Sequence, residues 1–175
     1  MSALIADTID TATARLHAAG VPSPRADAEI LVGHVLGLGR GNLLARSLVG
    51  GRVDEDDLTA ISALLVRRES REPLQHITGE ADFRSLRLAV GPGVFVPRPE
   101  TEIVVQHAID ALMAVASPTP IAVDLGTGSG AIALAMATEV PHASVTAVEV
   151  SPLAFTWAEQ NRRSVQADNA RIVLA

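Results

Sequence analysis

The sequence predicts an α/β fold in which a helical N-terminal region and a short hairpin precede a parallel sheet. Apolar residues recur at helical spacing through residues 2–72, and apolar and polar residues alternate on both sides of Ser85. From Ile121 onward, strand, glycine-rich turn and helix patterns follow one another. Strands that alternate with helices pair in parallel through crossover helices, so the last observation sets the fold class.

Composition argues against several classes of protein. The chain has 175 residues, of which 48% are hydrophobic and 19% are charged, as in globular domains. No apolar run reaches membrane length and the early Asp7 is unlike a secretion signal, so we expect a cytoplasmic protein without membrane contact. The absence of Cys leaves no disulfide or thiolate metal site. A net charge of −6 argues against direct binding to nucleic acid.

Four helices are expected in the N-terminal region. The first follows a Ser2 cap, the second begins at Ser23-Pro24, a third covers residues 42–48, and the fourth follows Asp54. Short connections between them predict a small bundle. It holds no convincing cluster of catalytic residues.

The middle of the chain is expected to change from helix to hairpin and back to helix. Pro73 breaks the helical pattern, and Phe83–Arg84 and residues 86–90 are expected to form two strands around Ser85. A further helix should begin near Pro99-Glu100 and bury one apolar face. That face comprises Val104, Val105, Ala108, Ile109 and Leu112.

The C-terminal region is expected to hold three parallel strands, at residues 121–125, 144–150 and 171–174, joined by helices at 129–138 and 152–163. The turn after the first strand carries Gly126, Gly128 and Gly130. Glycines there allow a sharp turn and close approach to a ligand, and free amides at a helix N-terminus can donate to it. The pattern alone is weak, because such a turn can be mere geometry.

Two acidic residues near the glycine turn favour binding of a nucleoside ligand over a purely geometric role for the turn. Glu149 ends the second strand, where a carboxylate can accept hydrogen bonds from both ribose hydroxyls. Asp124 lies two residues before Gly126, where a nicotinamide-binding loop usually has an apolar residue, and it suits a cationic ligand such as S-adenosylmethionine. A lysine-dependent phosphate loop is excluded because the chain has no Lys. The alternatives are that Glu149 is a solvated strand end and that Asp124 caps a helix.

Three segments together resemble the PrmC/HemK family. They are residues 23–31 (Ser-Pro-Arg-Ala-Asp-Ala-Glu-Ile-Leu), 71–79 (Arg-Glu-Pro-Leu-Gln-His-Ile-Thr-Gly) and 96–102 (Val-Pro-Arg-Pro-Glu-Thr-Glu). Many methyltransferases share the glycine turn, whereas its combination with residues 96–102 is far more specific. The resemblance covers essentially the whole chain.

The resemblance implies methyl transfer from S-adenosylmethionine to the side-chain amide nitrogen of the glutamine in the Gly-Gly-Gln motif of peptide-chain release factors. It implies a helical release-factor-docking domain at residues 1–75, a hairpin linker at 76–96, and the N-terminal part of a Rossmann-like methyltransferase domain at 97–175. The residues implied to contact the cofactor are Asp124, Gly126, Thr127, Gly128, Ser129, Gly130 and Glu149. Those implied to border the methyl-transfer pocket are Phe95, Pro97, Arg98, Pro99, Glu100 and Thr101.

One family feature is absent. The Asn-Pro-Pro-Tyr motif, which in the family orients the substrate amide, belongs after the fourth strand, and this sequence ends at Ala175 after the expected third. No catalytic residue is therefore assigned, and we expect the chain to be incomplete for catalysis and to leave an apolar sheet edge open. Three other functions stay open: a different methyltransferase acting on a small molecule or nucleic acid, a nicotinamide-dependent oxidoreductase, and a non-catalytic fragment that only binds a partner.

We favour structural roles for the histidines, the tryptophan and a small cluster of arginines. No histidine shares metal-ligand spacing with another histidine or an acid, so no metal site is expected. We expect His76 in the linker and Trp157 in the core. Arg67, Arg68 and Arg71 are expected at a solvated helix end, with contact to a partner as the alternative.

Overall fold

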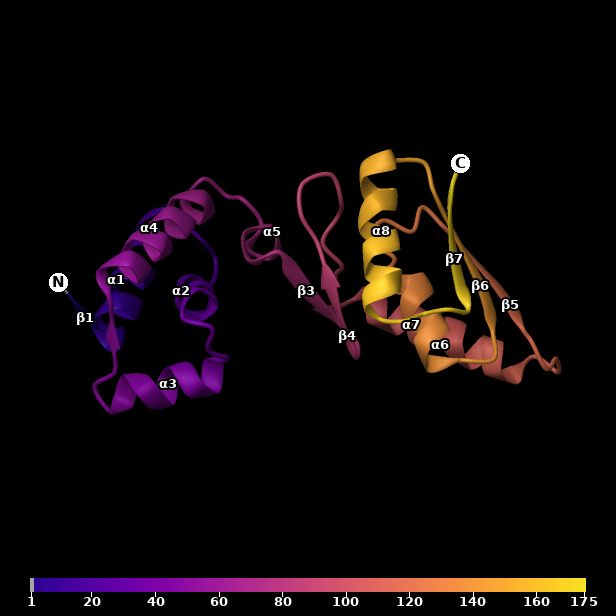
Figure 1. Ribbon diagram of the computed structural model, residues 1–175, viewed down its shortest axis with the longest axis horizontal. Helices are drawn as coiled ribbons and strands as arrows, with labels where there is room; N and C mark the ends of the chain where they lie inside the picture. Colours follow the sequence, from indigo (N-terminus) through magenta and orange to yellow (C-terminus); the bar gives the residue numbers. More distant parts are fainter. Residues whose placement is uncertain (1) are drawn as a thin grey trace. The chain divides into compact units, whose positions relative to one another are not determined.

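The computed structural model describes residues 2–175, and the chain divides into two compact units, Met1–Thr78 and Gly79–Ala175 (Figure 1). Each unit has a hydrophobic core of its own. Within residues 2–175, no helix is both long and apolar enough to cross a membrane.

The first unit is a helical bundle, as predicted. Its helices are α1 (Ile5–Ala18), α2 (Pro24–Val35), α3 (Arg40–Leu48), α4 (Glu55–Glu69) and the short α5 (Leu74–Thr78). The helices α1 and α2 pack on each other, and both contact α4. Completely buried side chains fill the space between the helices, namely Ile9, Leu16, Leu31, Val32 and Leu43.

The N-termini of the helices differ in whether a side chain caps them. Asp54 caps α4 by accepting a hydrogen bond of 2.9 Å from the backbone N–H of Asp57, as predicted. The side chain of Ser23 makes no capping hydrogen bond at the start of α2. The predicted Ser2 cap is wrong, because β1 (Ala3–Leu4) pairs antiparallel with β2 (Arg52–Val53) and α1 begins only at Ile5. A ladder of two residues is too short to leave a period-two pattern in the sequence.

A hairpin opens the second unit. Its strands β3 (Glu80–Phe83) and β4 (Leu86–Ala89) pair antiparallel, with Phe83 opposite Leu86. Arg84 lies in the turn with φ +53°, so the prediction that it extends the first strand is wrong. Phe83 and Leu86 are buried in the same core as the helices and sheet of this unit, and the hairpin is therefore part of that unit's packing.

The sheet of the second unit is parallel, which confirms the predicted class. The strands β5 (Ile121–Leu125), β6 (Ser144–Glu149) and β7 (Ala170–Leu174) lie in the order β5-β6-β7. The helices α7 (Ala131–Glu139) and α8 (Pro152–Ser164) connect them, and α6 (Thr101–Ala114) precedes β5 and packs on α7.

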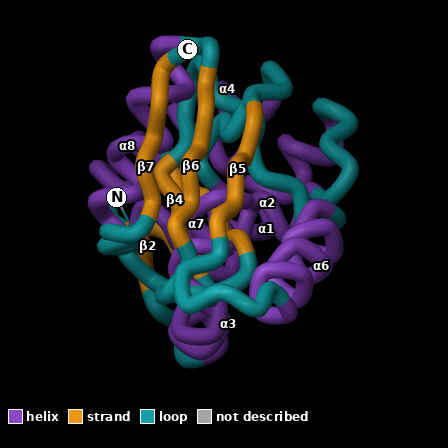
Figure 2. Tube along the Cα trace, turned by 90° about the vertical axis from the view of Figure 1, so that its right-hand side faces the viewer, coloured by secondary structure: helices purple, strands orange, loops and turns teal. Residues whose placement is uncertain are grey.

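The two faces of this sheet differ. On one face, Val145, Ala147 and Ile172 are buried under α7 and α8. On the other face, Val123 and Leu125 remain more than half exposed, and Figure 2 shows the three strands in front with α7 and α8 behind them. Packing of the buried face against α7 and α8 therefore fixes where the strands of this sheet end.

The buried stripe of α6 is narrower than predicted. Val105, Ile109 and Leu112 are buried, whereas Val104 is 60% exposed. Adjacent helical residues lie about 100° apart around the axis. A stripe centred on Val105 and Ile109 therefore turns Val104 towards solvent.

Candidate functional site

The turn after β5, which we call the glycine loop (residues 126–130), has a backbone that requires glycine. Gly126, Gly128 and Gly130 have φ of +73°, +59° and +85°, values that side chains of L-residues rarely tolerate. A Cβ at Gly126 or Gly128 would meet nothing within 4 Å, whereas one at Gly130 would lie 2.9 Å from Leu134. The loop is therefore open on the side of Gly126 and Gly128 and closed against α7 at Gly130.

The neighbouring strand holds this loop in place. The backbone N–H groups of Gly126 and Thr127 donate to the carbonyl of Val148 at 2.8 and 3.1 Å. Ser129 is buried, as is Thr127, so little of either side chain is available to a large ligand. What the loop presents outward is mainly backbone.

Glu149 is a buried carboxylate at the end of β6. It is 6% exposed and accepts three backbone hydrogen bonds, from Gly128 at 2.8 Å and from Val150 and Ser151 at 2.9 Å each. Burial by itself raises the pKa of Glu149, but the N–H groups of Ser151, Gly128 and Val150 outweigh burial, and the pKa lies below its usual value. The side chain is thus a charged acceptor at neutral pH, and the alternative of a solvated strand end is wrong.

Asp124 lies on β5 in the register position beside Ala147 of β6. Its Oδ2 atom accepts a hydrogen bond of 2.7 Å from the hydroxyl of Thr127. The alternative role as a helix cap is wrong, because Gly130 is the N-cap of α7 and no side chain donates or accepts there. Two carboxylates, Asp124 and Glu149, therefore flank the glycine loop at the ends of adjacent strands.

The segment predicted to border the methyl-transfer pocket is anchored at its beginning. Val94 is buried in a small cluster with Ala81, Val90 and Ala154, the last of these in the first turn of α8. The side chains that follow are largely solvent-accessible: Phe95 is 88% exposed, Arg98, Pro99 and Glu100 are exposed, and Pro97 and Thr101 are half-buried.

Sequence reasoning did not identify a charged clamp at the hairpin turn. The guanidinium of Arg84 donates to both carboxylate oxygens of Glu139 at 2.6 and 2.7 Å and to Gln106 at 2.8 Å. Its backbone N–H donates to Glu102 at 3.0 Å. The ion pair with Arg84 holds the pKa of Glu139 below its usual value. Glu102, within the family-like segment 96–102, thus has a structural partner.

A second residue that sequence reasoning missed is Asn161 of α8. It is completely buried and is hydrogen-bonded to both the hairpin and the glycine loop. The available signal was its position: Asn161 follows Ala154 and Ala158 on the buried stripe of α8, where an apolar residue is the rule.

In the first unit, the family-like segment 23–31 supplies two buried carboxylates, Asp27 and Glu29, that form ion pairs. Asp27 accepts a hydrogen bond of 2.8 Å from Arg68, and both side chains are largely buried. Glu29 is bonded to Arg25 at 2.8 Å and to Arg40 at 2.7 Å. Burial raises the pKa of Glu29, but the hydrogen bonds from these two arginines outweigh it and lower the pKa.

The arginines at and just after the end of α4 fit the predicted solvated helix end in part: Arg71 is exposed and the Arg67 side chain is 42% exposed, whereas that of Arg68 is only 15% exposed. Arg67 forms a two-bond pair with Glu72, Arg68 also donates to the carbonyl of Glu72, and Arg71 donates to the carbonyl of Ala19. His76 lies in α5, where its backbone N–H donates to the carbonyl of Pro73. These residues stabilise the first unit.

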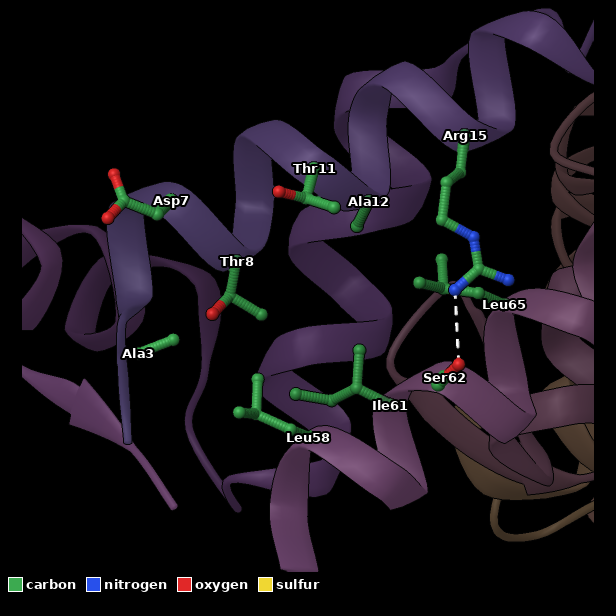
Figure 3. Close-up of a pocket in the computed structure, with 10 residues that line it drawn as sticks. All are labelled: Ala3, Asp7, Thr8, Thr11, Ala12, Arg15, Leu58, Ile61, Ser62 and Leu65. Carbon is green, nitrogen blue, oxygen red and sulfur yellow. Dashed lines mark hydrogen bonds between the residues drawn. The ribbon is translucent and has the colours of Figure 1, made fainter. Parts of the chain in front are cut away.

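The first unit also has a hollow of about 180 Å³ between α1 and α4. Figure 3 shows its apolar side chains beside the polar Asp7, Thr11 and Ser62, with Arg15 donating to Ser62 at 3.1 Å. The lining residues are Ala3, Asp7, Thr8, Thr11, Ala12, Arg15, Leu58, Ile61, Ser62 and Leu65. Across residues 2–175, no group of three or more His, Asp or Glu side chains is placed to hold a metal ion.

Comparison with known proteins gives matches over both units. Residues 7–79 match the model of the PrmC N-terminal domain, and residues 91–175 match that of the methyltransferase small domain. The release factor glutamine methyltransferase of Streptomyces coelicolor is 52% identical over 169 residues, which is 96% of this chain and 57% of that protein. The protein of the same name from Escherichia coli is 42% identical over 151 residues, covering 86% of this chain and 53% of that protein.

The chain thus spans a little over half the length of these curated relatives. Among solved structures, Trm5b from Pyrococcus abyssi is 18% identical, with a TM-score of 0.46, over 55% of this chain and 28% of that one.

Proposed function

Because the chain belongs to the PrmC/HemK family, with a PrmC N-terminal domain followed by a methyltransferase small domain, we propose that the protein is a release factor glutamine methyltransferase. Its cofactor is S-adenosylmethionine, and its substrate is the glutamine side-chain amide of the Gly-Gly-Gln motif in peptide-chain release factors. The release-factor assignment rests on the similarity of the chain to release factor glutamine methyltransferases. The observation that carries the cofactor assignment is the buried Glu149 carboxylate bonded to the middle of the glycine loop. Release factors act on the ribosome, so the reaction takes place in the cytoplasm.

The residues present fit this cofactor. Gly126 and Gly128 have no side chain and open space beside them, so a ligand can approach the backbone there. Glu149 keeps one free acceptor site, on Oε2, for a ribose hydroxyl, since a carboxylate has about four lone-pair sites and three are used. Asp124 places a second negative charge where the amino group and sulfonium of the cofactor would lie. A dinucleotide, with its pyrophosphate, is disfavoured by the carboxylate of Asp124 at this position.

The bound cofactor supplies an electrophilic methyl group. In the overall reaction a carbon–sulfur bond breaks, a carbon–nitrogen bond forms, and the amide nitrogen releases one proton. An amide is a poor nucleophile, so the protein contributes mainly by positioning and by electrostatics. We assign cofactor binding to Asp124, the glycine loop and Glu149, and we assign the border of the methyl-transfer pocket to Phe95 and residues 97–101.

We assign release-factor docking to the first unit. Its match to the PrmC N-terminal domain supports this role. The hollow between α1 and α4 is the place to probe the contact. Ser62→Phe, which fills the hollow, should raise the KM for release factor and leave the KM for cofactor unchanged. The exposed Asp10→Phe on α1 is its control.

The test uses the full-length protein with purified release factor. Mass spectrometry should find one added methyl group on the Gly-Gly-Gln peptide, and none on a release factor whose motif glutamine is replaced by alanine. Methylation of RNA or of a small molecule instead would move the protein to another methyltransferase class. Binding of NAD without binding of S-adenosylmethionine would contradict the proposal altogether.

A further inference from the structure

The side chain of Asn161 joins two segments that are far apart in sequence. Its Oδ1 accepts a hydrogen bond of 2.7 Å from the backbone N–H of Ala89, and its Nδ2 donates to the carbonyl of Ala89 at 3.0 Å. The same Nδ2 donates to the carbonyl of Ser129 at 2.9 Å. One fully buried amide thus bonds the end of β4 and the glycine loop simultaneously.

The chemistry of this position selects asparagine. Both Nδ2 hydrogens are directed at carbonyl oxygens and Oδ1 faces an N–H group, so the amide has one orientation that satisfies every partner. Aspartate has the same shape but no donors, and leucine has neither donor nor acceptor. Either replacement leaves buried backbone groups of Ala89 and Ser129 without partners, which is costly in a dry interior.

One turn earlier on α8, Trp157 holds the hairpin exit, which we define as residues 89–92. Its indole N–H donates to the carbonyl of Pro92 at 3.2 Å. Its ring lies so close to Gly91 that a Cβ there would be 2.7 Å from the ring. Beyond the hairpin exit, the buried Val94 leads into the pocket-bordering residues, so the position of the exit sets where that segment begins.

The glycine loop is also close to α8. A Cβ at Gly130 would lie 3.7 Å from the Cα of Ala158, between Trp157 and Asn161 on the same helix. The start of α8 is held by Glu149, which accepts from the N–H of Ser151. A single helix therefore contacts the ribose-binding carboxylate, the glycine loop and the hairpin exit.

We propose that Asn161 is a positioning residue for methyl transfer, which couples the glycine loop to the hairpin exit so that cofactor and substrate-bordering segment are held in one geometry. This inference rests on the proposed function, because it assigns the loop to the cofactor and residues 95–101 to the substrate side. Asn161 acts through Ser129 and Ala89 and needs no contact with the reacting atoms.

The test compares Asn161→Asp with Asn169→Asp in the full-length protein. Asn169 is a matched control, because its Nδ2 also donates to backbone carbonyls, those of Ala137, Val140 and Ala143, and makes no bond to the glycine loop. Both variants keep the side-chain shape and lose the donors. If Asn161→Asp fails to fold, Asn161→Ala, which leaves room for a water to bridge the backbone groups, takes its place.

Hydrogen exchange without ligand is the first readout. Asn161→Asp should speed exchange in the glycine loop and the hairpin exit together, while Asn169→Asp speeds it only around residues 137–143.

Steady-state kinetics with cofactor and release factor is the second readout. Asn161→Asp should raise the KM for cofactor about tenfold and also lower kcat, and Asn169→Asp should change neither. Faster exchange at only one of the two segments, or equal kinetic effects of the two variants, overturns the proposal. A wild-type protein that binds no S-adenosylmethionine refutes the proposed function instead, and the exchange data still decide the coupling.

Discussion

The carboxylate of Glu149 and the backbone N–H of Gly128 are joined by a hydrogen bond of 2.8 Å, so the end of β6 holds the glycine loop at its middle residue. The other oxygen of Glu149 holds the start of α8. One side chain therefore fixes both borders of the candidate cofactor site, and it is charged while doing so.

Glu149→Gln should weaken binding of S-adenosylhomocysteine about tenfold, because three charge-assisted hydrogen bonds become neutral and the new NH₂ group faces a backbone N–H. Isothermal titration calorimetry measures the change. Asp168→Asn removes an exposed acid of the same unit and should leave the affinity unaltered. An unchanged affinity in Glu149→Gln would place the ribose elsewhere.

Stability should depend on the charge of Glu149. Its pKa in the folded protein lies below the unfolded value of about 4.5, so the carboxylate contributes stability above pH 4.5 that is lost as the pH falls through the folded pKa. The melting temperatures of the wild type and Glu149→Gln, measured from neutral to acidic pH, should therefore converge below pH 4.5. A difference that stays constant across this window contradicts the assignment. Taking the difference removes the contributions of other carboxylates, such as Glu139.

Two glycines of the loop should respond differently to alanine. Gly128→Ala should cost about 1 kcal/mol of unfolding free energy, because only the backbone is strained there. Gly130→Ala should cost about 2 kcal/mol or more, since its Cβ also meets the completely buried Leu134 at 2.9 Å. Urea denaturation measures both. Gly41→Ala, in the first turn of α3 with open space around it, is the control and should stabilise by about 0.5 kcal/mol at most.

The charged clamp on the hairpin turn should require arginine. Arg84→Lys should lower the unfolding free energy by about 1 kcal/mol, because a lysine cannot reproduce the two-bond pair with Glu139 together with the bond to Gln106. Arg87→Lys is the control, since Arg87 is 69% exposed on the same hairpin and makes only long contacts with Asp82 and Glu80. Equal effects of the two substitutions in chemical denaturation would show that the clamp contributes nothing.

The buried pair of the first unit should be sensitive to loss of one partner. Asp27→Asn leaves Arg68 as an uncompensated buried charge and should destabilise by about 2 kcal/mol. Asp10→Asn disrupts the exposed pair with Arg25 and should have little effect. The unfolding transition of the first unit, followed by helical circular dichroism, distinguishes the two variants, and a transition unmoved by Asp27→Asn would refute the prediction.

The elements that repeat a pattern over several residues could be predicted from the sequence. The alternation from Ile121 gave three parallel strands and two helices within a residue or two of their observed bounds, and Asp54 marked the start of α4. The ladder of Ala3–Leu4 with Arg52–Val53 and the single turn of α5 could not be predicted, because neither is long enough to show a period.

The candidate site was predictable where chemistry is local in sequence and not where it depends on distant partners. The glycines and Glu149 lie at strand ends, and it is from that position that we propose a cofactor-binding role for them. Asn161 and Arg84 work through residues 72 and 55 positions away, at Ala89 and Glu139, and no local pattern identifies such partners.

The contact between Trp157 and Gly91 has a practical consequence. The chain has one tryptophan and no tyrosine, so its near-ultraviolet emission comes from a single indole that is packed against the backbone at the base of the hairpin. An unlabelled sample therefore carries its own optical probe, which is confined to the second unit and sensitive to any shift of the chain at that point.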